Sequence, residues 1–165
     1  MMRLLLIVVL VALGHHSSQA QHRCWGDPEP FRWVYDEAEL LDYSTEARVQ
    51  VGLEQFNQAY DVVLILYLAP DLCGWSSLGF ATVLGSDWGV GDAQLDNGLV
   101  MMISPKNEVQ SGGVALSVGK GLETRLTDAE AQGIIDGMIP QLKNKEWYAA
   151  LVWALNQGLP AALTD

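Results

Sequence analysis

The fold is decided by the stretch Val62-Val63-Leu64-Ile65-Leu66-Tyr67-Leu68, a continuous apolar run, rich in β-branched residues, that ends at Pro70. Such a run is typical of a strand that is covered on both faces, because a strand with one wet face alternates apolar and polar side chains. We therefore expect residues 62–68 to form a central strand with helices on both sides of its sheet.

Helices are expected on either side of this strand. Residues 44–59 have an apolar stripe at helical spacing, with Ser44 as the predicted N-cap. After the strand, the pattern predicts a shorter helix over residues 76–85 and then a glycine-broken segment over residues 86–97.

Two further apolar runs, at residues 99–103 and 114–118, predict two more strands. The alternation of apolar strands with amphipathic helices predicts an α/β class fold, a layered α/β/α sandwich with a mixed central sheet. The chain has 165 residues, of which 50% are hydrophobic, so we expect a single domain, over residues 34–160.

The C-terminal part of the chain should be helical. Thr127 and Glu130 have the spacing of a capping box, in which the two side chains satisfy open backbone N–H groups, so a helix should begin there. A last helix is expected from about residue 146, with Gly158 and Pro160 as its stop.

Residues 1–20 are typical of a secretory signal peptide. They contain the early cation Arg3, an apolar run over residues 4–13 and a small-residue end at Ala20. The apolar run is shorter than the roughly 20 residues that cross a bilayer, so we expect cleavage near Ala20 and no transmembrane segment in the mature chain. The product would be secreted or periplasmic, with residues 21–33 as an N-terminal arm.

The charge balance and the histidine count exclude several classes of function. The chain has 9 Lys and Arg against 20 Asp and Glu, for a net charge of −11, which repels phosphate backbones. We therefore expect no nucleic-acid partner. After cleavage His22 is the only histidine left, so Ser-His-Asp and Cys-His machinery lacks its base and a His-rich zinc site cannot form.

Two cysteines, Cys24 and Cys73, remain in a compartment that favours oxidation. One interpretation is a disulfide that ties the N-terminal arm to the body of the domain. The other is a pair of unpaired thiols, and the sequence leaves both open.

Acidic residues gather among glycines just before the strand at 99–103. They are Asp87, Asp92 and Asp96, followed by Asn97. Carboxylates on one loop repel each other unless a cation or protons neutralise them, and such oxygen ligands suit Ca²⁺ or Mg²⁺, although the spacing is not that of an EF-hand. Asp-Asn-Gly is also an ordinary turn, so a structural interpretation competes.

Asp128 and the glycine pair after the strand at 114–118 have the same ambiguity. An acid at the first helical position is favourable whether or not a ligand is near. Gly119 and Gly121 could cradle an anion through backbone N–H groups, but no helix follows them directly, which favours a tight turn. Trp88 and Trp147 could line a pocket, although large aromatics beside glycine more often pack in a core.

Several motifs follow one another along the chain: Val34-Tyr35-Asp36-Glu37-Ala38-Glu39-Leu40-Leu41, Trp88-Gly89-Val90-Gly91, Asp96-Asn97-Gly98-Leu99, Val118-Gly119-Lys120-Gly121-Leu122-Glu123, Leu126-Thr127-Asp128 and Trp147-Tyr148-Ala149. Together they resemble the TPM domain family over about residues 34–154. That family includes thylakoid-lumen proteins tied to photosystem II repair, bacterial exported proteins and an animal receptor modulator. The resemblance implies an α/β sandwich.

The resemblance also implies functions. Several members of the family bind calcium or another divalent cation at acidic residues at one end of the sheet, and plant members are described as acid phosphatases. Carried over by motif, the metal ligands here would be Asp36, Asp96, Asn97, Glu123 and Asp128, with Asp87 and Asp92 as additions. This chain departs from the family at Tyr60-Asp61, where Thr-Gly is usual, and at Lys120, where an aromatic or small residue is common.

Two hypotheses of function follow. In the first, the chain is an exported, calcium-binding accessory module that acts on a membrane-associated protein complex, with the ion ordering the loops that meet the partner. In the second, it is a metal-assisted acid phosphatase, with Asp96 or Asp128 as ligand or general base; its weakness is an acidic surface on which only Lys120 and Arg125 lie near the proposed site. A purely structural domain is the remaining alternative, and no catalytic residue is assigned.

Overall fold

A computed structural model describes residues 23–108 and 110–164, so the expected signal peptide lies outside the described residues. The strands are β1 (Val34–Asp36), β2 (Val63–Leu68), β3 (Gly98–Ser104) and β4 (Gly113–Val118). The helices are α1 (Tyr43–Tyr60), α2 (Ser77–Trp88), the short η1 (Lys120–Leu122), α3 (Asp128–Lys143), α4 (Trp147–Trp153), the π-helical η2 (Ala154–Gly158) and α5 (Leu159–Leu163).

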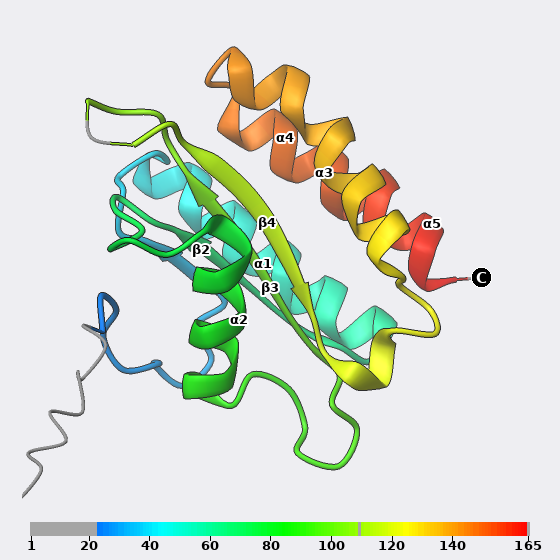
Figure 1. The fold of residues 1–165 in the computed structure, drawn as a ribbon. Coiled ribbons are helices and arrows are strands. Elements are labelled where there is room, and N and C mark those ends of the chain that lie inside the picture. Colours follow the sequence, from blue (N-terminus) through cyan, green and yellow to red (C-terminus); the bar gives the residue numbers. More distant parts are fainter. Residues whose placement is uncertain (1–22, 109, 165) are drawn as a thin grey trace, which may run out of the picture.

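The four strands form one mixed sheet in the order β1-β2-β3-β4 (Figure 1). The first three strands are parallel, and β4 runs antiparallel to β3. In the register, Asp36 pairs with Leu68 and Val63 pairs with Gly98, so the carboxyl ends of β1, β2 and β3 lie at one edge of the sheet. The expected mixed sheet within a single α/β domain is confirmed.

Helices cover both faces of the sheet, because β2 buries side chains on both of its faces. Leu64, Leu66 and Leu68 join the larger core, which contains the apolar sides of α1 and of α3 to α5. Ile65 and Tyr67 point the other way and join a smaller core under α2. The continuous apolar run therefore predicts a doubly covered strand correctly.

The two crossover connections have opposite handedness. The sheet order advances by one strand through α1 and again by one strand through α2, but the two helices lie on opposite faces. Two parallel crossovers that move in one direction on opposite faces cannot both be right-handed, which is the strongly preferred hand. One connection therefore departs from that preference.

Two helix boundaries differ from the sequence-based expectation. The N-cap of α1 is Asp42 rather than Ser44, since the Asp42 carboxylate accepts hydrogen bonds from the Thr45 backbone N–H. The last helical segment does not stop at Gly158 and Pro160 but continues through η2 into α5. Pro160 lies in the first turn of α5, directly after the π-helical η2.

The arm before β1 is packed against the domain. Cys24 and Cys73 form a disulfide, so of the two interpretations the bridge is present. Trp25 is buried in the core under α2, and the Trp88 indole N–H donates to the Gly26 carbonyl oxygen at 3.0 Å. In the part of the chain that the structure describes, no helix has the length and apolarity to cross a membrane.

Candidate functional site

A hollow of about 620 Å³ lies at the amino end of β3 and the carboxyl end of β4. The loop after α2 and the residues that enter η1 form its walls. Its charged lining consists of Asp92, Asp96 and Glu123, with Lys120 beside them. This is the place where the sequence motifs rich in glycine and acid meet.

Glycines allow the two loops around this hollow to touch through their backbones. A Cβ on Gly121 would overlap the carbonyl oxygen of Leu95, and a Cβ on Gly119 would overlap that of Asp96. Their N–H groups instead donate across the gap, Gly119 to the Gly98 carbonyl oxygen at 2.8 Å and Gly121 to that of Asp96 at 3.1 Å. Gly119 and Gly121 are thus part of a tight backbone contact, as the turn interpretation expects.

Asn97 holds the loop in place and has little capacity left for a metal. Its side-chain oxygen accepts from the Asp92 backbone N–H at 2.9 Å, and its side-chain nitrogen donates to the Asp61 carbonyl oxygen at 2.8 Å. The side chain is buried, with the residue 7% exposed. A buried amide with both ends satisfied stabilises the loop, so we assign Asn97 a structural role.

Asp92 and Asp96 are positioned by turns in the same loop. One carboxylate oxygen of Asp92 accepts from the backbone N–H groups of Gln94 and Leu95, at 2.8 and 3.0 Å. Asp96 has a left-handed backbone with φ of +47°, a conformation that aspartate tolerates better than most residues. Both side chains are exposed at the hollow.

Asp36 lies at the opposite end of the sheet from this hollow. Asp36 is the last residue of β1, and the register places it beside Leu68, the last residue of β2. Asp96 comes just before β3, whose first residue pairs with Val63, the first residue of β2. Five residues along β2 separate these two ends, or about 16 Å at the rise of a strand. The Asp36 carboxylate accepts from the backbone N–H groups of Leu40 and Leu41, at 3.0 and 2.7 Å.

The five residues carried over by motif therefore do not form one shell of ligands. Asp96 and Glu123 line the hollow, and Asp92 joins them as one of the additions. Asp36 is at the far edge, Asn97 is used within the loop, and Asp128 begins α3 without lining the hollow. Asp87, the other addition, pairs with Arg23 and Trp25 of the arm.

No three His, Cys, Asp or Glu side chains come close enough to hold a metal ion in residues 23–108 and 110–164. The five-residue set thus does not fit a dehydrated cation held by protein ligands alone. A divalent ion in the hollow would have to complete its coordination with water, as Ca²⁺ and Mg²⁺ commonly do.

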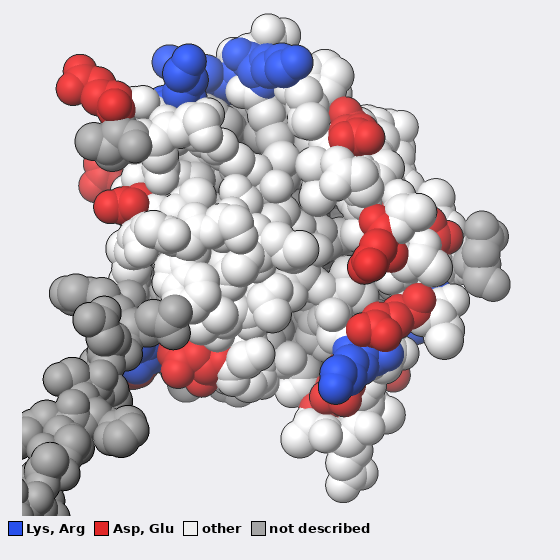
Figure 2. Space-filling model, in the orientation of Figure 1, with Lys and Arg blue, Asp and Glu red and all other residues white. Residues whose placement is uncertain are grey.

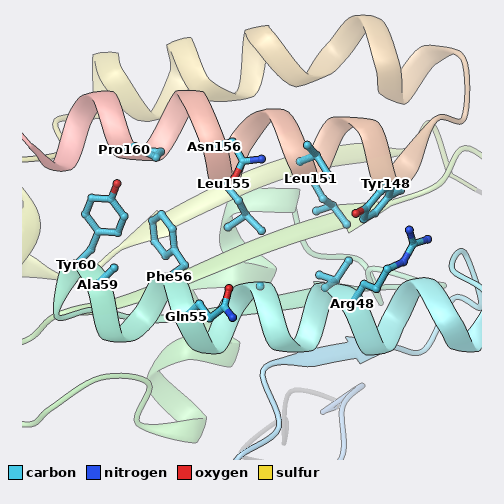
Figure 3. Close-up of a pocket in the computed structure, with 13 residues that line it drawn as sticks. Arg48, Gln55, Phe56, Ala59, Tyr60, Tyr148, Leu151, Leu155, Asn156 and Pro160 are labelled. Carbon is cyan, nitrogen blue, oxygen red and sulfur yellow. The ribbon is translucent and has the colours of Figure 1, made fainter.

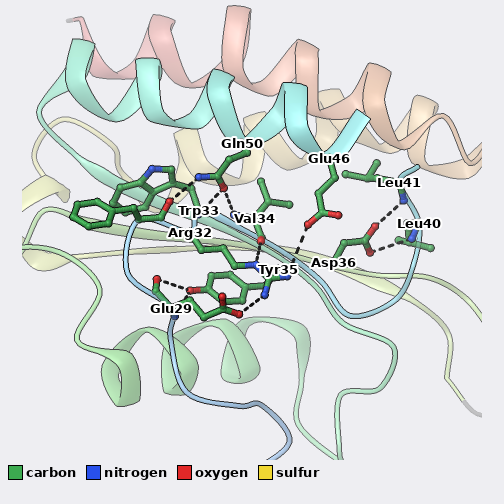
Figure 4. Close-up of polar contacts among 11 residues, drawn as sticks. Glu29, Arg32, Trp33, Val34, Tyr35, Asp36, Leu40, Leu41, Glu46 and Gln50 are labelled. Atoms are coloured by element: carbon green, nitrogen blue, oxygen red, sulfur yellow. Dashed lines mark hydrogen bonds and ion pairs between the residues drawn. The ribbon is translucent and has the colours of Figure 1, made fainter. Parts of the chain in front are cut away.

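Sequence reasoning missed a polar network that fixes β1 next to α1 (Figure 4). The Gln50 side-chain oxygen accepts from the backbone N–H groups of Trp33 and Val34, at 2.8 and 3.1 Å. Arg32 packs over the ring of Tyr35 and bridges to Glu29 at 2.6 Å. Burial raises the pKa of Tyr35. A glutamine inside an amphipathic helix carries no signal for such a contact.

A groove of about 450 Å³ between α1 and the C-terminal helices was also not foreseen (Figure 3). Its sides come from α1 and from the α4–η2 segment, and Arg48 lies over the ring of Tyr148 at 4.7 Å. The Arg48 side chain also donates to the Thr45 hydroxyl at 3.0 Å. Arg48, the one cationic residue that lines this groove, is thus engaged in contacts with neighbouring side chains.

Comparisons with known proteins agree with the fold. The solution NMR structure of the N-terminal domain of a P. gingivalis protein is similar with a TM-score of 0.64 and 26% identity, covering 81% of this chain and 85% of that one. The N-terminal domain of a Corynebacterium glutamicum protein is similar in fold, with a TM-score of 0.58 and 16% identity over 88% of this chain and 91% of that one. A search of curated proteins gives no match. The TPM domain family matches residues 34–158, and the chain belongs to that family.

Proposed function

We propose that the chain is an exported accessory module that binds a divalent cation, Ca²⁺ foremost, in the hollow at the amino end of β3. The observation that supports this proposal is that three acidic residues, Asp92, Asp96 and Glu123, line one hollow between two closely packed loops. Like charges gathered in this way repel each other, and a divalent cation relieves that repulsion.

The chemistry of such a site would combine protein and water oxygens. Asp92, Asp96 and Glu123 would supply carboxylates partly through bridging water, because the three do not come close enough to ligate one ion directly. Water would also supply the remaining ligands, because Ca²⁺ takes six to eight oxygens in flexible geometry. A site with few direct ligands binds weakly, in the range of about 0.1–1 mM that suits extracellular modules. Ion binding would then order the loop before β3 and η1 for contact with a membrane-associated protein complex.

Calorimetric titration of the mature protein with Ca²⁺ tests the proposal. Binding is expected in the wild type and its loss is expected in Asp96→Asn and Glu123→Gln. Glu54→Gln is the matched control, since it removes the same charge from the exposed side of α1. Equal binding by Asp96→Asn and by the control, or no heat at millimolar Ca²⁺, would contradict the proposal.

Acid phosphatase activity is the alternative, and Lys120 is the observation that favours it. Lys120 shares the hollow with Asp96 and would offset the unfavourable field that the net charge of −11 presents to a phosphate group. A bound cation would supply a Lewis acid and an activated water when present. Asp96 would accept a proton from that water.

Phosphate release from a generic monoester, with and without chelator, separates the two functions. Turnover that disappears in both Asp96→Asn and Lys120→Gln would favour the phosphatase over the accessory module. Calcium binding without turnover would favour the module. Activity that survives in Asp96→Asn would come from a contaminant or another site and would exclude this hollow as the active site.

A further inference from the structure

A second hollow, of about 590 Å³, lies at the opposite edge of the sheet from the acidic one. It opens between the β3–β4 hairpin, the loop after β1 and the turn that joins α3 to α4. We infer that this hollow binds a small amphipathic anion, a molecule with an apolar body and a carboxylate or phosphate head. Three features of the hollow carry this inference.

The floor of the hollow is apolar and partly buried. It is built from Leu40, Val114, Ile139, Leu142 and Trp147. Ile139 packs against neither of the two core clusters, although it lies on the inner side of α3 next to Met138 and Leu142. An aliphatic side chain in that position gains by burial under a ligand, at about 25 cal/mol for each Å² covered.

The rim of the hollow is basic in a strongly acidic protein. Lys106, Lys143 and Lys145 line it, and no acidic residue does. Figure 2 shows Lys and Arg side chains gathered along the upper edge of the molecule, over the α3–α4 turn and the β3–β4 hairpin. None of the three lysines forms an ion pair with a described carboxylate. Their ammonium groups are thus available to an anionic head.

Stabilisation of the C-terminal end of α3 does not by itself explain why three lysines line the rim of this hollow. Lys143 and Lys145 lie at the C-terminal end of α3, where cations are favourable in any helix. Lys106, however, belongs to the hairpin after β3 and converges on the same hollow from a separate element. The hollow also lies at the carboxyl end of β3, beside the start of β4.

The backbone next to Lys106 contacts neighbouring segments of the chain. Gln110 donates to the Pro70 carbonyl oxygen at 3.1 Å and accepts from the Leu72 backbone N–H at 3.2 Å. Gly112 has φ of +76°, and a Cβ there would lie 2.7 Å from the Lys106 backbone nitrogen. Lys145 itself has a left-handed backbone, with φ of +62°.

The size and charge of the hollow favour a small molecule over a bilayer surface. A volume of about 590 Å³ is within the range of small-ligand pockets. Three lysines would contribute little to docking on an anionic membrane, since the chain as a whole carries a net charge of −11 and would be repelled. A single anionic head group is small enough to interact with the three lysines alone, so the net negative charge of the chain repels it less than it repels an extended anionic surface.

Calorimetric titration with octanoate and octyl phosphate tests the inference. Both are expected to bind, and 1-octanol, which has the same tail and no charge, is expected to bind more weakly. Lys143→Gln/Lys145→Gln should weaken octanoate binding by about 2- to 30-fold, the effect of losing two exposed charge contacts. Lys120→Gln, at the other edge of the sheet, is the matched control and should bind octanoate as the wild type does.

A second variant tests the apolar floor. Ile139→Ser removes a side chain that lies outside both cores, so the fold should persist in circular dichroism while octanoate binding weakens. Equal affinity for inorganic phosphate and octyl phosphate would overturn the inference, because the floor would then contribute nothing. Binding to phosphatidylglycerol vesicles without binding to octanoate, or unchanged octanoate binding in both variants, would overturn it as well.

Discussion

The indole N–H of Trp25 donates a 2.8 Å hydrogen bond to a carboxylate oxygen of Asp87, which lies 62 residues further along the chain. The same carboxylate oxygen pairs with Arg23 at 2.9 Å. Asp87 thus joins the arm to the end of α2, close to the Cys24–Cys73 disulfide. Its carboxylate is used for docking the arm and does not line the acidic hollow.

Replacing Asp87 by alanine should therefore destabilise the protein without changing cation binding. The Trp25 indole would lose its acceptor in a partly buried place, so we expect a loss of about 1–2 kcal/mol in the free energy of unfolding, measured with urea. Asp27→Ala is the control, because its side chain is 86% exposed and contacts only the Arg23 end of this cluster. An equally large loss in the free energy of unfolding for Asp27→Ala would contradict this role of Asp87.

The N-cap of α1 gives a prediction about pH. Hydrogen bonds from the Ser44 hydroxyl, and next from the Thr45 backbone and hydroxyl, lower the pKa of Asp42 to about 2. A carboxyl with a lowered folded pKa contributes stability above its unfolded pKa of about 3.9 and loses that contribution as the pH falls toward 2. The melting temperature of Asp42→Ala should lie below that of the wild type at pH 7, with the gap closing between pH 4 and pH 2.

Ser44→Ala is the matched variant for this cap. It removes one hydrogen bond to Asp42 but leaves the bonds from Thr45, so its melting temperature should fall less than that of Asp42→Ala. A larger fall in melting temperature for Ser44→Ala than for Asp42→Ala would indicate that Ser44, and not Asp42, is the N-cap that matters. A gap that stays constant down to pH 2 would show that the Asp42 charge contributes nothing.

Asn97 gives a test that separates a structural amide from a metal ligand. In Asn97→Asp the side chain can no longer donate to the Asp61 carbonyl oxygen, and a carbonyl acceptor is left unpaired next to a new charge. We expect a loss of about 1–3 kcal/mol in urea denaturation. Asn97→Ala should lose a similar amount. Calcium binding that becomes tighter in Asn97→Asp, with unchanged stability, would make Asn97 a ligand after all.

The sequence predicted best those elements that local pattern decides. The run at residues 62–68 needs no partner to be recognised as a doubly buried strand, and Thr127 with Glu130 forms the capping box in full. The end of the C-terminal helices is decided by tertiary contacts instead. Leu159 and Leu163 are buried in the larger core, and this burial carries the helix past Gly158.

The placement of Asp36 could have been derived with one more step. Asp36 ends a strand and Asp96 precedes one, and in parallel strands joined by helices these positions fall at opposite edges of the sheet. The register then separates Asp36 from Asp96 by about the length of β2. The basic hollow was harder to foresee, since Lys106 and Lys143 meet there only through the packing of α3 on the β3–β4 hairpin.

The glycines around the acidic hollow provide the last prediction, with a glycine of α3 as the matched control. In Gly121→Ala the new methyl group would overlap the Leu95 carbonyl oxygen, which is backbone and cannot swing aside. Gly133 has open space around its Cβ position within a helix. We therefore expect urea denaturation to show a loss of about 1–3 kcal/mol for Gly121→Ala and a gain of about 0.5–1 kcal/mol for Gly133→Ala. Gly121→Ala should also weaken calcium binding, because Glu123 would move with the displaced loop. A fully stable Gly121→Ala protein would show that the two loops are not held together by this backbone contact.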